Sequence, residues 1–251
     1  PCPDSIDPAE LIGQVRPVGE PELRLMGISA LTGAATSDGT SSGLGNDTDF
    51  ALLNALRVWS DAVLVGAETA RKENYFGVKV SEQQRREREA AGQQPVPPIV
   101  VVSRSLDFDT DTQLFTDTAV APVFTVPNAA LDGGDIAARA DAIRRAGGEI
   151  LPVGGDSLAA VVGALRERGH ARIVCEGGPS VNTQLVEQDL VDVFHYTISP
   201  LAVQPSAVRL FGESDETCER RFELEAVHRT SDSLLFCRYR SGRDSSPQRT
   251  R

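Results

Sequence analysis

Two glycine-containing turns have the composition of phosphate-binding sites. Gly66 follows the apolar run Ala62–Val65, and Gly177-Gly178-Pro179 follows the run Arg172–Cys175. Each turn opens a helical pattern, so unpaired N–H groups at a helix N-terminus would face a bound diphosphate. The alternative for either turn is a glycine that only makes a tight connection between strand and helix. The second turn is the more specific, because two glycines and a proline at the first helical position exceed what a simple turn requires.

A serine–arginine pair ends another apolar run. Ile99–Ser103 is strand-like and is followed directly by Arg104. A hydroxyl and a guanidinium at one strand end can hold a phosphate through charge-assisted hydrogen bonds, which suits the 2′-phosphate of NADPH. By itself the pair is weak evidence, since arginine is common on surfaces. Neither glycine turn has G-x-G-x-x-G spacing, and no lysine follows a glycine loop, so the Rossmann and P-loop fingerprints are absent.

Short apolar runs supply the strands that would position these turns. Several are β-branched and lack polar alternation, as expected for strands covered on both faces. Only a short turn near 229–232 separates the last two runs, which predicts an antiparallel hairpin. The predicted strands are Leu23–Ala30, Ala62–Val65, Ile99–Ser103, Pro122–Val126, Glu149–Val153, Arg172–Cys175, Val191–Ser199, Phe222–His228 and Ser233–Tyr239.

Helical patterns fall between these runs. Asp47–Ser60 carries an apolar stripe, and Asp47 or Asp49 can cap its N-terminus. Ser81–Gly92 has a Ser-x-x-Gln start but no apolar face, so we expect a solvated surface helix within an insertion of about 77–98. The other predicted helices are Asp135–Ala146, Ser157–Arg168 and Pro179–Gln188.

This alternation predicts an α/β fold. We expect a single domain over 23–240, with a mixed, mostly parallel twisted sheet of about nine strands, helices on both faces and a C-terminal antiparallel hairpin. Residues 1–22 are rich in proline, glycine and acids and predict an extended lead-in. The polar segment 241–251 predicts a disordered tail.

Composition narrows the class of protein further. The formal net charge is -11, which argues against a general nucleic-acid binder but leaves room for an anionic cofactor held by a few local arginines. The four cysteines and three histidines are scattered, without zinc or haem spacing, so we expect no metal site. No apolar stretch reaches the length of a membrane span and no signal-peptide region opens the sequence, so we expect a cytoplasmic protein with free thiols.

The motifs together resemble the RibD C-terminal reductase family, which shares the dihydrofolate-reductase-like fold. The resemblance runs from about Leu23 to Arg240. It is carried by Ser29…Gly33…Asp38-Gly39, Asp61-Ala-x-Leu-Val-Gly66-Ala-x-Thr69, Ser103-Arg104 and Glu176-Gly177-Gly178-Pro179-Ser180. Members of the family use NADPH to reduce the ribosyl group of 5-amino-6-ribosylamino-pyrimidinedione 5′-phosphate to ribityl, so the resemblance implies this riboflavin-pathway reaction. The sequence lacks the His-x-Glu and Pro-Cys-x-x-Cys motifs of the zinc deaminase half of bifunctional members, so we expect deamination to need another protein.

The resemblance also implies roles for individual residues. Glu176 would lie beside the reacting centre as a catalytic residue, together with Thr32. Residues implied to bind NADPH are Gly66, Ala67, Thr69, Arg71, Ser103, Arg104, Gly177, Gly178, Pro179 and Ser180. Residues implied to bind the substrate are Ser29, Thr36, Asp38, Gly39, Thr40 and Asn74.

Two positions depart from the family pattern. The first strand of the family usually ends Ser-Leu-Asp-Gly, whereas here the run is Ala30-Leu31-Thr32-Gly33, so a hydroxyl replaces a carboxylate that could bind a heterocycle or deliver a proton. Tyr75 stands where the family usually has proline.

The sequence is therefore compatible with three functions. The first is a pyrimidine reductase, the second a dihydrofolate-reductase-like pterin reductase, and the third a non-catalytic NADPH-binding paralogue that keeps the cofactor motifs but has lost the Asp. Thr32 counts against the second, because a carboxylate best binds a protonated pterin. We also expect a homodimer, from the resemblance and because a mixed sheet leaves an edge that a symmetric partner can cover.

Overall fold

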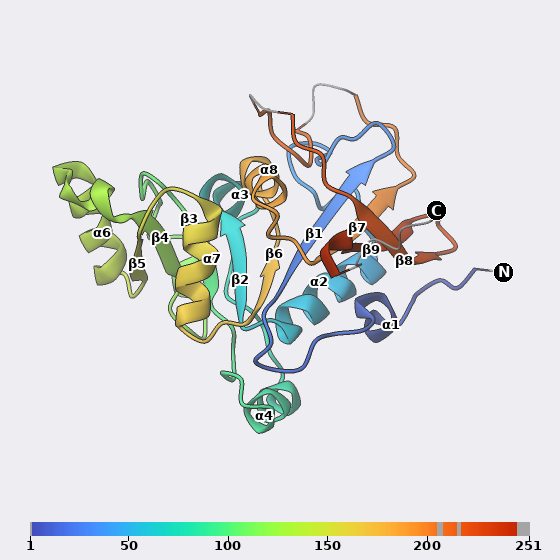
Figure 1. Cartoon of the computed structure of the whole chain (residues 1–251), viewed down its shortest axis with the longest axis horizontal. Coiled ribbons are helices and arrows are strands. Elements are labelled where there is room, and N and C mark those ends of the chain that lie inside the picture. The colour runs from blue at the N-terminus through green and yellow to red at the C-terminus, as the bar shows by residue number, and fades with distance from the viewer. Residues whose placement is uncertain (1, 205–207, 215–216, 245–251) are drawn as a thin grey trace, which may run out of the picture.

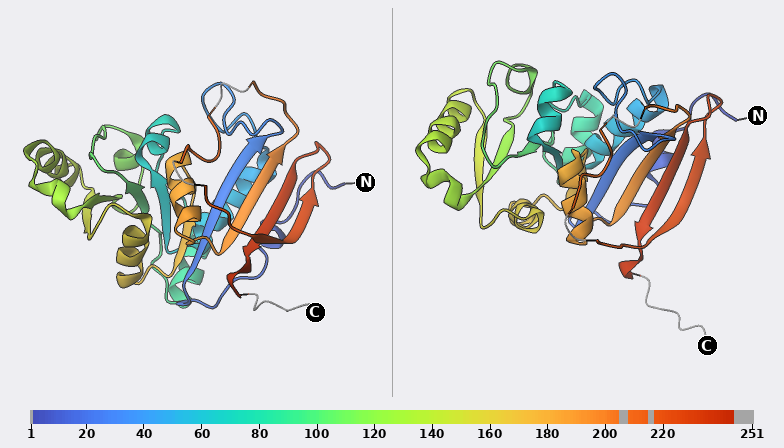
Figure 2. Two further views of the ribbon diagram at one scale, coloured as in Figure 1. Left: turned by 45° about the horizontal axis from the view of Figure 1, so that its top comes forward. Right: turned by 90° about the horizontal axis from the view of Figure 1, so that it is seen from above.

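The computed structural model describes residues 2–204, 208–214 and 217–244. The nine strands within these ranges form one sheet. The strand order is β5-β4-β3-β2-β6-β1-β7-β9-β8, and β9 runs in the direction opposite to that of the other eight strands. The strands twist progressively across the sheet (Figure 2). The predicted α/β fold and its C-terminal hairpin are confirmed. The strands are β1 (Glu22–Ala30), β2 (Ala62–Gly66), β3 (Ile99–Val102), β4 (Val123–Pro127), β5 (Glu149–Val153), β6 (Arg172–Cys175), β7 (Val193–Ser199), β8 (Phe222–Arg229) and β9 (Leu235–Ser241).

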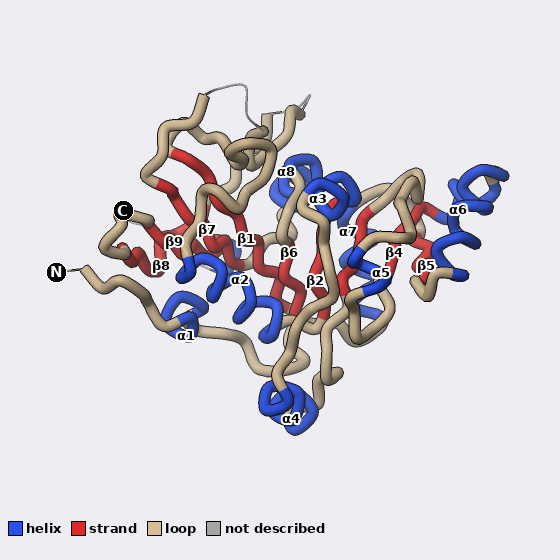
Figure 3. Tube along the Cα trace, turned by 180° about the vertical axis from the view of Figure 1, so that it is seen from behind, coloured by secondary structure: helices blue, strands red, loops and turns tan. Residues whose placement is uncertain are grey.

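Helices cover both faces of this sheet, as Figures 1 and 3 show from opposite sides. Along β2 the side chains alternate, so Val63 and Val65 pack on one face while Ala62 and Leu64 pack on the other. The first face carries α2 (Asp47–Trp59), α3 (Ala67–Lys72), α5 (Gln113–Thr116) and α6 (Gly134–Arg145), and the second carries α7 (Leu158–Glu167) and α8 (Pro179–Glu187). The remaining helices are α1 (Pro8–Ile12), α4 (Glu82–Ala90) and the short 3-10 helices η1 (Asn128–Asp132) and η2 (Gly242–Asp244).

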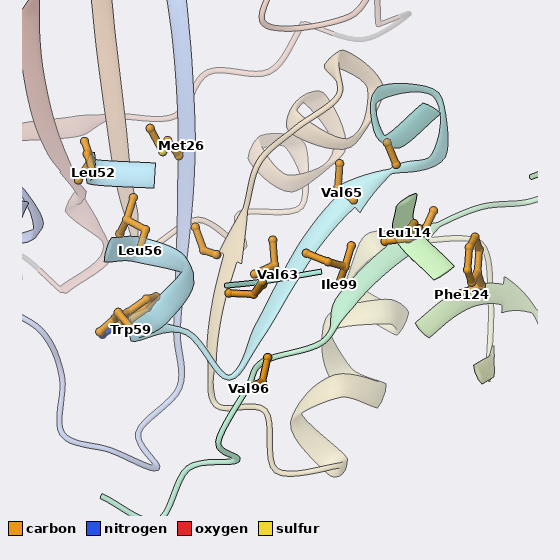
Figure 4. Close-up of a cluster of buried hydrophobic side chains, with 14 of the residues drawn as sticks. Met26, Leu52, Leu56, Trp59, Val63, Val65, Val96, Ile99, Leu114 and Phe124 are labelled. Carbon is orange, nitrogen blue, oxygen red and sulfur yellow. The ribbon is translucent and has the colours of Figure 1, made fainter. Parts of the chain in front are cut away.

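Helix α2 is fixed to the sheet by an apolar cluster (Figure 4). Leu52, Leu56 and Trp59 project from one side of α2 into the same cluster as Met26 of β1 and Val63 of β2. Leu52 and Leu56 are 2% and 0% exposed. Each fully buried side chain of this size stabilises the folded state by roughly 1.5–3 kcal/mol, so the position of α2 on the sheet is strongly determined.

Three local features differ from the sequence-based expectation. A helix, α1, interrupts the lead-in and buries Leu11 against the cluster beneath α2. Asn46 caps α2, and its Oδ1 accepts from the backbone N–H of Asp49 at 3.0 Å, so the predicted cap at Asp47 or Asp49 is wrong. The predicted tail begins with the end of β9 and with η2, while 245–251 lie outside the described residues.

The charged helix α4 lies at the end of the sheet opposite the carboxyl ends of the parallel strands (Figure 1). Its predicted capping box is present, with Ser81 and Gln84 bonded reciprocally. The prediction that α4 is solvated all round is wrong at one position, because Arg88 is only 3% exposed. The Arg88 guanidinium donates to the carbonyl of Ser60 at 2.8 Å and to that of Gln94 at 2.9 Å, which ties the insertion to the α2–β2 connection.

Among the described residues, no helix combines the length and the apolar character needed to cross a membrane. Within the same ranges, no group of three or more His, Cys, Asp or Glu side chains is arranged to hold a metal ion.

Candidate active site

A cavity of about 480 Å³ opens beyond the carboxyl ends of β2, β3 and β6. Its walls come from the segments that follow these strands, from the middle of β1, from the first two turns of α2 and from 208–210. In a sheet of this kind the carboxyl ends of neighbouring parallel strands meet at one edge, which is where ligands bind. Turns far apart in the sequence therefore line one cavity.

All ten residues predicted to bind the cofactor line this cavity. They are Gly66, Ala67, Thr69, Arg71, Ser103, Arg104, Gly177, Gly178, Pro179 and Ser180. Glu176, predicted as catalytic, also lines it, as do Thr36 and Gly39 from the predicted substrate side.

The two glycine turns touch each other. The N–H of Gly66 donates to the carbonyl of Gly177 at 2.8 Å. A Cβ at Gly178 would lie 2.5 Å from the hydroxyl of Thr69, and a Cβ at Gly66 would lie 3.2 Å from a methyl of Val181. Gly177 has φ +95°, a conformation that L side chains rarely adopt. The glycines are therefore needed for the close approach of the two turns.

The first turn of α8 offers the anion-binding groups that the sequence predicted. Gly178 is the N-cap and Pro179 occupies the first helical position. The N–H groups of Ser180 and Val181 have no partner within the helix, because they belong to its first turn. Both residues line the cavity, so these donors and the positive end of the helix are placed where a diphosphate could bind.

Ser103 and Arg104 form a turn at the end of β3. The Ser103 hydroxyl accepts from the N–H of Leu106 at 2.9 Å, and this bond shapes the turn that carries Arg104. Arg104 is exposed at the cavity wall. Nearby, Arg71 donates to the carbonyl of Asp107 at 2.6 Å and lies over the ring of Phe108. The cavity mouth thus presents two guanidinium groups on the side of β3.

Glu176 is held by three donors. Arg57 donates from Nε to Oε1 at 2.6 Å and from Nη2 to Oε2 at 2.7 Å, and the Tyr75 hydroxyl donates to Oε2 at 2.7 Å. The Glu176 and Arg57 side chains are only 3% and 8% exposed. Three of the roughly four acceptor positions of the carboxylate are filled, so Glu176 is an oriented anion that can accept one further donor.

The electrostatics of this cluster follow from burial and from the Glu176 charge. Burial by itself would lower the pKa of Arg57, but the adjacent Glu176 carboxylate outweighs it and holds that pKa above its ordinary value. Burial, followed by the Glu176 charge, raises the pKa of Tyr75 well above its ordinary value. Both donors therefore keep their protons at neutral pH.

Sequence reasoning missed Arg57 and did not assign a contact to Tyr75. A signal for Arg57 was present, because it lies four residues after Leu53 on the apolar side of α2, where an arginine needs a buried partner. Asp49, interpreted from the sequence as a capping residue, also lines the cavity.

Five predicted site residues lie outside the cavity lining. Thr32 is at the tip of a tight turn in which the N–H of Ala30 donates to Ala34, and its exposed hydroxyl donates to the carbonyl of Val203 at 2.6 Å. Thr32 does not line the cavity, so the structure does not support its predicted catalytic role. The other four are Ser29, Asp38, Thr40 and Asn74. The Ser29 hydroxyl forms a hydrogen bond with the Tyr196 hydroxyl at 2.6 Å, and the Thr40 hydroxyl forms one with the Ser42 hydroxyl at 2.9 Å. Asp38 and Asn74 have positive φ.

Comparison with solved structures places this architecture among reductases. A pyrimidine reductase-like protein from Corynebacterium diphtheriae is 33% identical, with a TM-score of 0.84 over 94% of this chain and 99% of that chain. The riboflavin biosynthesis reductase of Saccharomyces cerevisiae is 15% identical, with a TM-score of 0.62 over 92% of this chain and 94% of that chain.

A third neighbour is larger. The diaminohydroxyphosphoribosylaminopyrimidine deaminase/5-amino-6-(5-phosphoribosylamino)uracil reductase of Thermotoga maritima is 20% identical, with a TM-score of 0.65 over 88% of this chain. This chain spans 57% of that protein. None of the curated proteins compared with the chain matches it.

The model of the RibD C-terminal domain family matches residues 26–236. The chain therefore belongs to this family, as its motifs indicated.

Proposed function

We propose that this protein is an NADPH-dependent reductase of riboflavin biosynthesis, which reduces the ribosyl group of 5-amino-6-ribosylamino-pyrimidinedione 5′-phosphate to ribityl. The observation that carries the proposal is the convergence of Gly66, Arg104 and Gly177 on one cavity. Family membership and the reductase neighbours support an oxidoreductase of this type.

The donor set of the cavity fits a phosphorylated dinucleotide. The first turn of α8 would hold the diphosphate, and Arg104 would hold the 2′-phosphate through its guanidinium. The two turns can approach each other only because Gly178 has no side chain, since a Cβ there would collide with Thr69, and both turns line the cavity. When bound, NADPH supplies the hydride, and the protein supplies placement.

The residues of the chain position the reactants. Glu176 keeps a fixed orientation because Arg57 and Tyr75 hold both of its oxygens, and its remaining acceptor position can orient a hydroxyl or an N–H of the substrate. Met26 and Leu53 give the adjoining wall an apolar surface suited to a flat ring.

The test is direct. The purified protein is incubated with NADPH and the ribosylamino-pyrimidine phosphate, and the absorbance of the reduced nicotinamide is followed. We expect turnover that needs both compounds, with NADPH preferred to NADH. Tight NADPH binding without turnover on this substrate would instead support the non-catalytic paralogue, and turnover on dihydrofolate alone would support the pterin reductase.

We further infer a cytoplasmic homodimer. Edge strand β8 exposes Leu224 and Val227, each at 54%, and a symmetric partner could cover them. Size-exclusion chromatography with light scattering should give the mass of a dimer, and a monomer at micromolar concentration would remove this inference.

A further inference from the structure

Arg209 is a cation of the cavity wall that has no partner within the described part of the chain. It lies in the segment that follows β7, is exposed and lines the cavity. Its guanidinium makes no hydrogen bond, ion pair or ring contact with any residue in 2–204, 208–214 or 217–244. Such a group can bind an anionic ligand without first breaking an existing ion pair.

The other cations of the cavity are either occupied or placed elsewhere. Lys72 pairs with Glu68 at 2.6 Å, and Arg71 donates to a backbone carbonyl at 2.6 Å. Arg104 also has an open guanidinium, but it follows β3, and β2 and β6 lie between β3 and β1 in the sheet. Neighbouring strands are about 4.8 Å apart, so the ends of β3 and β1 are separated by roughly 14 Å. Arg209, beside the end of β1, therefore offers a second anion site on a different wall.

The backbone on both sides of Arg209 is fixed. The N–H of Ala35 donates to the carbonyl of Val208 at 2.7 Å. The buried amide of Asn182 in α8 donates to the carbonyl of Leu210 at 2.8 Å. Because its two neighbours are held in this way, binding of a ligand by Arg209 costs mainly the rotamer freedom of one side chain.

The guanidinium of Arg209 lies at the substrate end of the cavity. A Cβ placed on Gly33, in the turn after β1, would be 3.3 Å from its Nη1, and its backbone forms an antiparallel bridge with Ala34. Figure 1 shows this loop and the segment after β7 together beyond the carboxyl end of β1. Thr36, in the same loop, lines the cavity with a hydroxyl that has no partner among the described residues. Met26, in the middle of β1, adds the apolar surface proposed for the ring.

The charge of the cavity explains why a phosphorylated substrate would need this cation. The chain has a formal net charge of -11. A phosphate monoester carries about −1.5 to −2 charges at pH 7, so carboxylates in the wall repel it. The planar fork of an arginine matches two phosphate oxygens and offsets this repulsion locally. The carboxylates that line the cavity are those of Asp49, Glu68, Glu73 and Glu176.

Resting on the proposed function, we propose that Arg209 is a specificity-determining residue that binds the 5′-phosphate of the ribosylamino-pyrimidine substrate. The Thr36 hydroxyl donates to the same phosphate. Arg209 lies outside every motif that the sequence offered for the substrate, which all fall within 29–40 or at Asn74. The site therefore selects the phosphate monoester over the corresponding nucleoside.

The experiment compares the phosphorylated substrate with its dephosphorylated nucleoside. The kcat/KM of each compound is measured with the full chain at saturating NADPH, for the wild type, Arg209→Gln and Arg209→Lys. Arg166→Gln is the matched control, because Arg166 is exposed on α7, lies outside the cavity lining and carries the same charge. The preference is the ratio of the two kcat/KM values, so any loss of folded protein cancels.

We expect the wild type and Arg166→Gln to prefer the phosphorylated compound by roughly 10- to 100-fold, the value of a hydrogen bond to a charged group. In Arg209→Gln the preference should fall to within about threefold, through a higher KM for the phosphorylated compound. Arg209→Lys keeps the charge without the planar fork, so its preference should lie between the two. The affinity for NADPH should stay within about threefold of wild type in both variants.

A wild type that reduces both compounds equally well, or a preference retained in Arg209→Gln, would overturn the inference and leave the proposed function standing. An equal loss for both compounds, together with weaker NADPH binding, would also overturn it, because Arg209 would then hold the diphosphate of the cofactor. Failure of the wild type to reduce either compound would end the proposed function, and this inference with it.

Discussion

The buried pair of Arg57 and Glu176 gives the sharpest prediction about stability. In Arg57→Met the side chain keeps an unbranched apolar stem but loses both charge-assisted bonds, at 2.6 and 2.7 Å. Glu176, with 3% of its side chain exposed, is then left with the Tyr75 hydroxyl as its remaining donor among the described residues.

The expected loss follows from these contacts. Two hydrogen bonds to a charged group contribute about 1.5–3 kcal/mol each, and breaking a buried ion pair by removing one partner costs about 3–5 kcal/mol. We therefore expect the free energy of unfolding to fall by about 3–5 kcal/mol. Domains have roughly 5–15 kcal/mol of stability in total, so the melting temperature should drop by roughly 6–20 °C.

Urea unfolding is the assay, followed by the fluorescence of Trp59, the one tryptophan of the sequence. Trp59 is 8% exposed and lies under the guanidinium of Arg24, so its emission should report unfolding of the α2 region. The matched variant is Arg57→Met with Glu176→Gln, which removes the unpaired charge and should recover most of the lost stability. A loss below about 1 kcal/mol in Arg57→Met, or no recovery in the double variant, would refute the reasoning.

Three further predictions concern single sites. Arg104→Ala should weaken NADPH binding about tenfold and NADH binding much less, because the guanidinium pairs with the 2′-phosphate; equal losses in a fluorescence titration would remove Arg104 from that role. Gly177→Ala should cost about 1–2 kcal/mol, because φ is +95°, whereas Gly163→Ala in helix α7, where a Cβ meets open space, should add up to about 1 kcal/mol. The same sign for both in urea unfolding would contradict this. Burial, and then the charge of Arg24, hold the pKa of His195 well below its ordinary value. The unfolded state then binds the proton first, so stability should fall by about 1.4 kcal/mol per pH unit as the pH drops below about 6.5. His195→Gln should flatten this slope, and parallel slopes for the two proteins would show that His195 does not set it.

The strands were predictable because each is a short apolar run with a clear end. β2 and β6 are buried on both faces, and their residues carry that signal without any knowledge of their neighbours. Helix α1 was missed, because five residues in a proline-rich segment show no period.

Part of the candidate site was likewise predictable from the sequence, and part was not. Its cofactor side was predictable, since Gly66 and Gly177 combine local turn chemistry with a place at a strand end. Asp49, Arg57 and Tyr75 gave weaker signals, because they meet Glu176 or the cavity only after α2 packs on the sheet. Thr32 was misplaced because its position in the motif indicates a strand end, whereas the hydrogen bonds of the turn decide where its side chain points.

The position of β6 has a consequence for synthesis of the chain on the ribosome. β6 lies between β1 and β2 and pairs with both, yet it is made from Arg172–Cys175, long after either partner. Until that segment has left the exit tunnel, β1 and β2 each keep an unpaired apolar edge. Truncated chains that stop before Arg172 should therefore aggregate, and a nascent chain of that length is a natural client for chaperones.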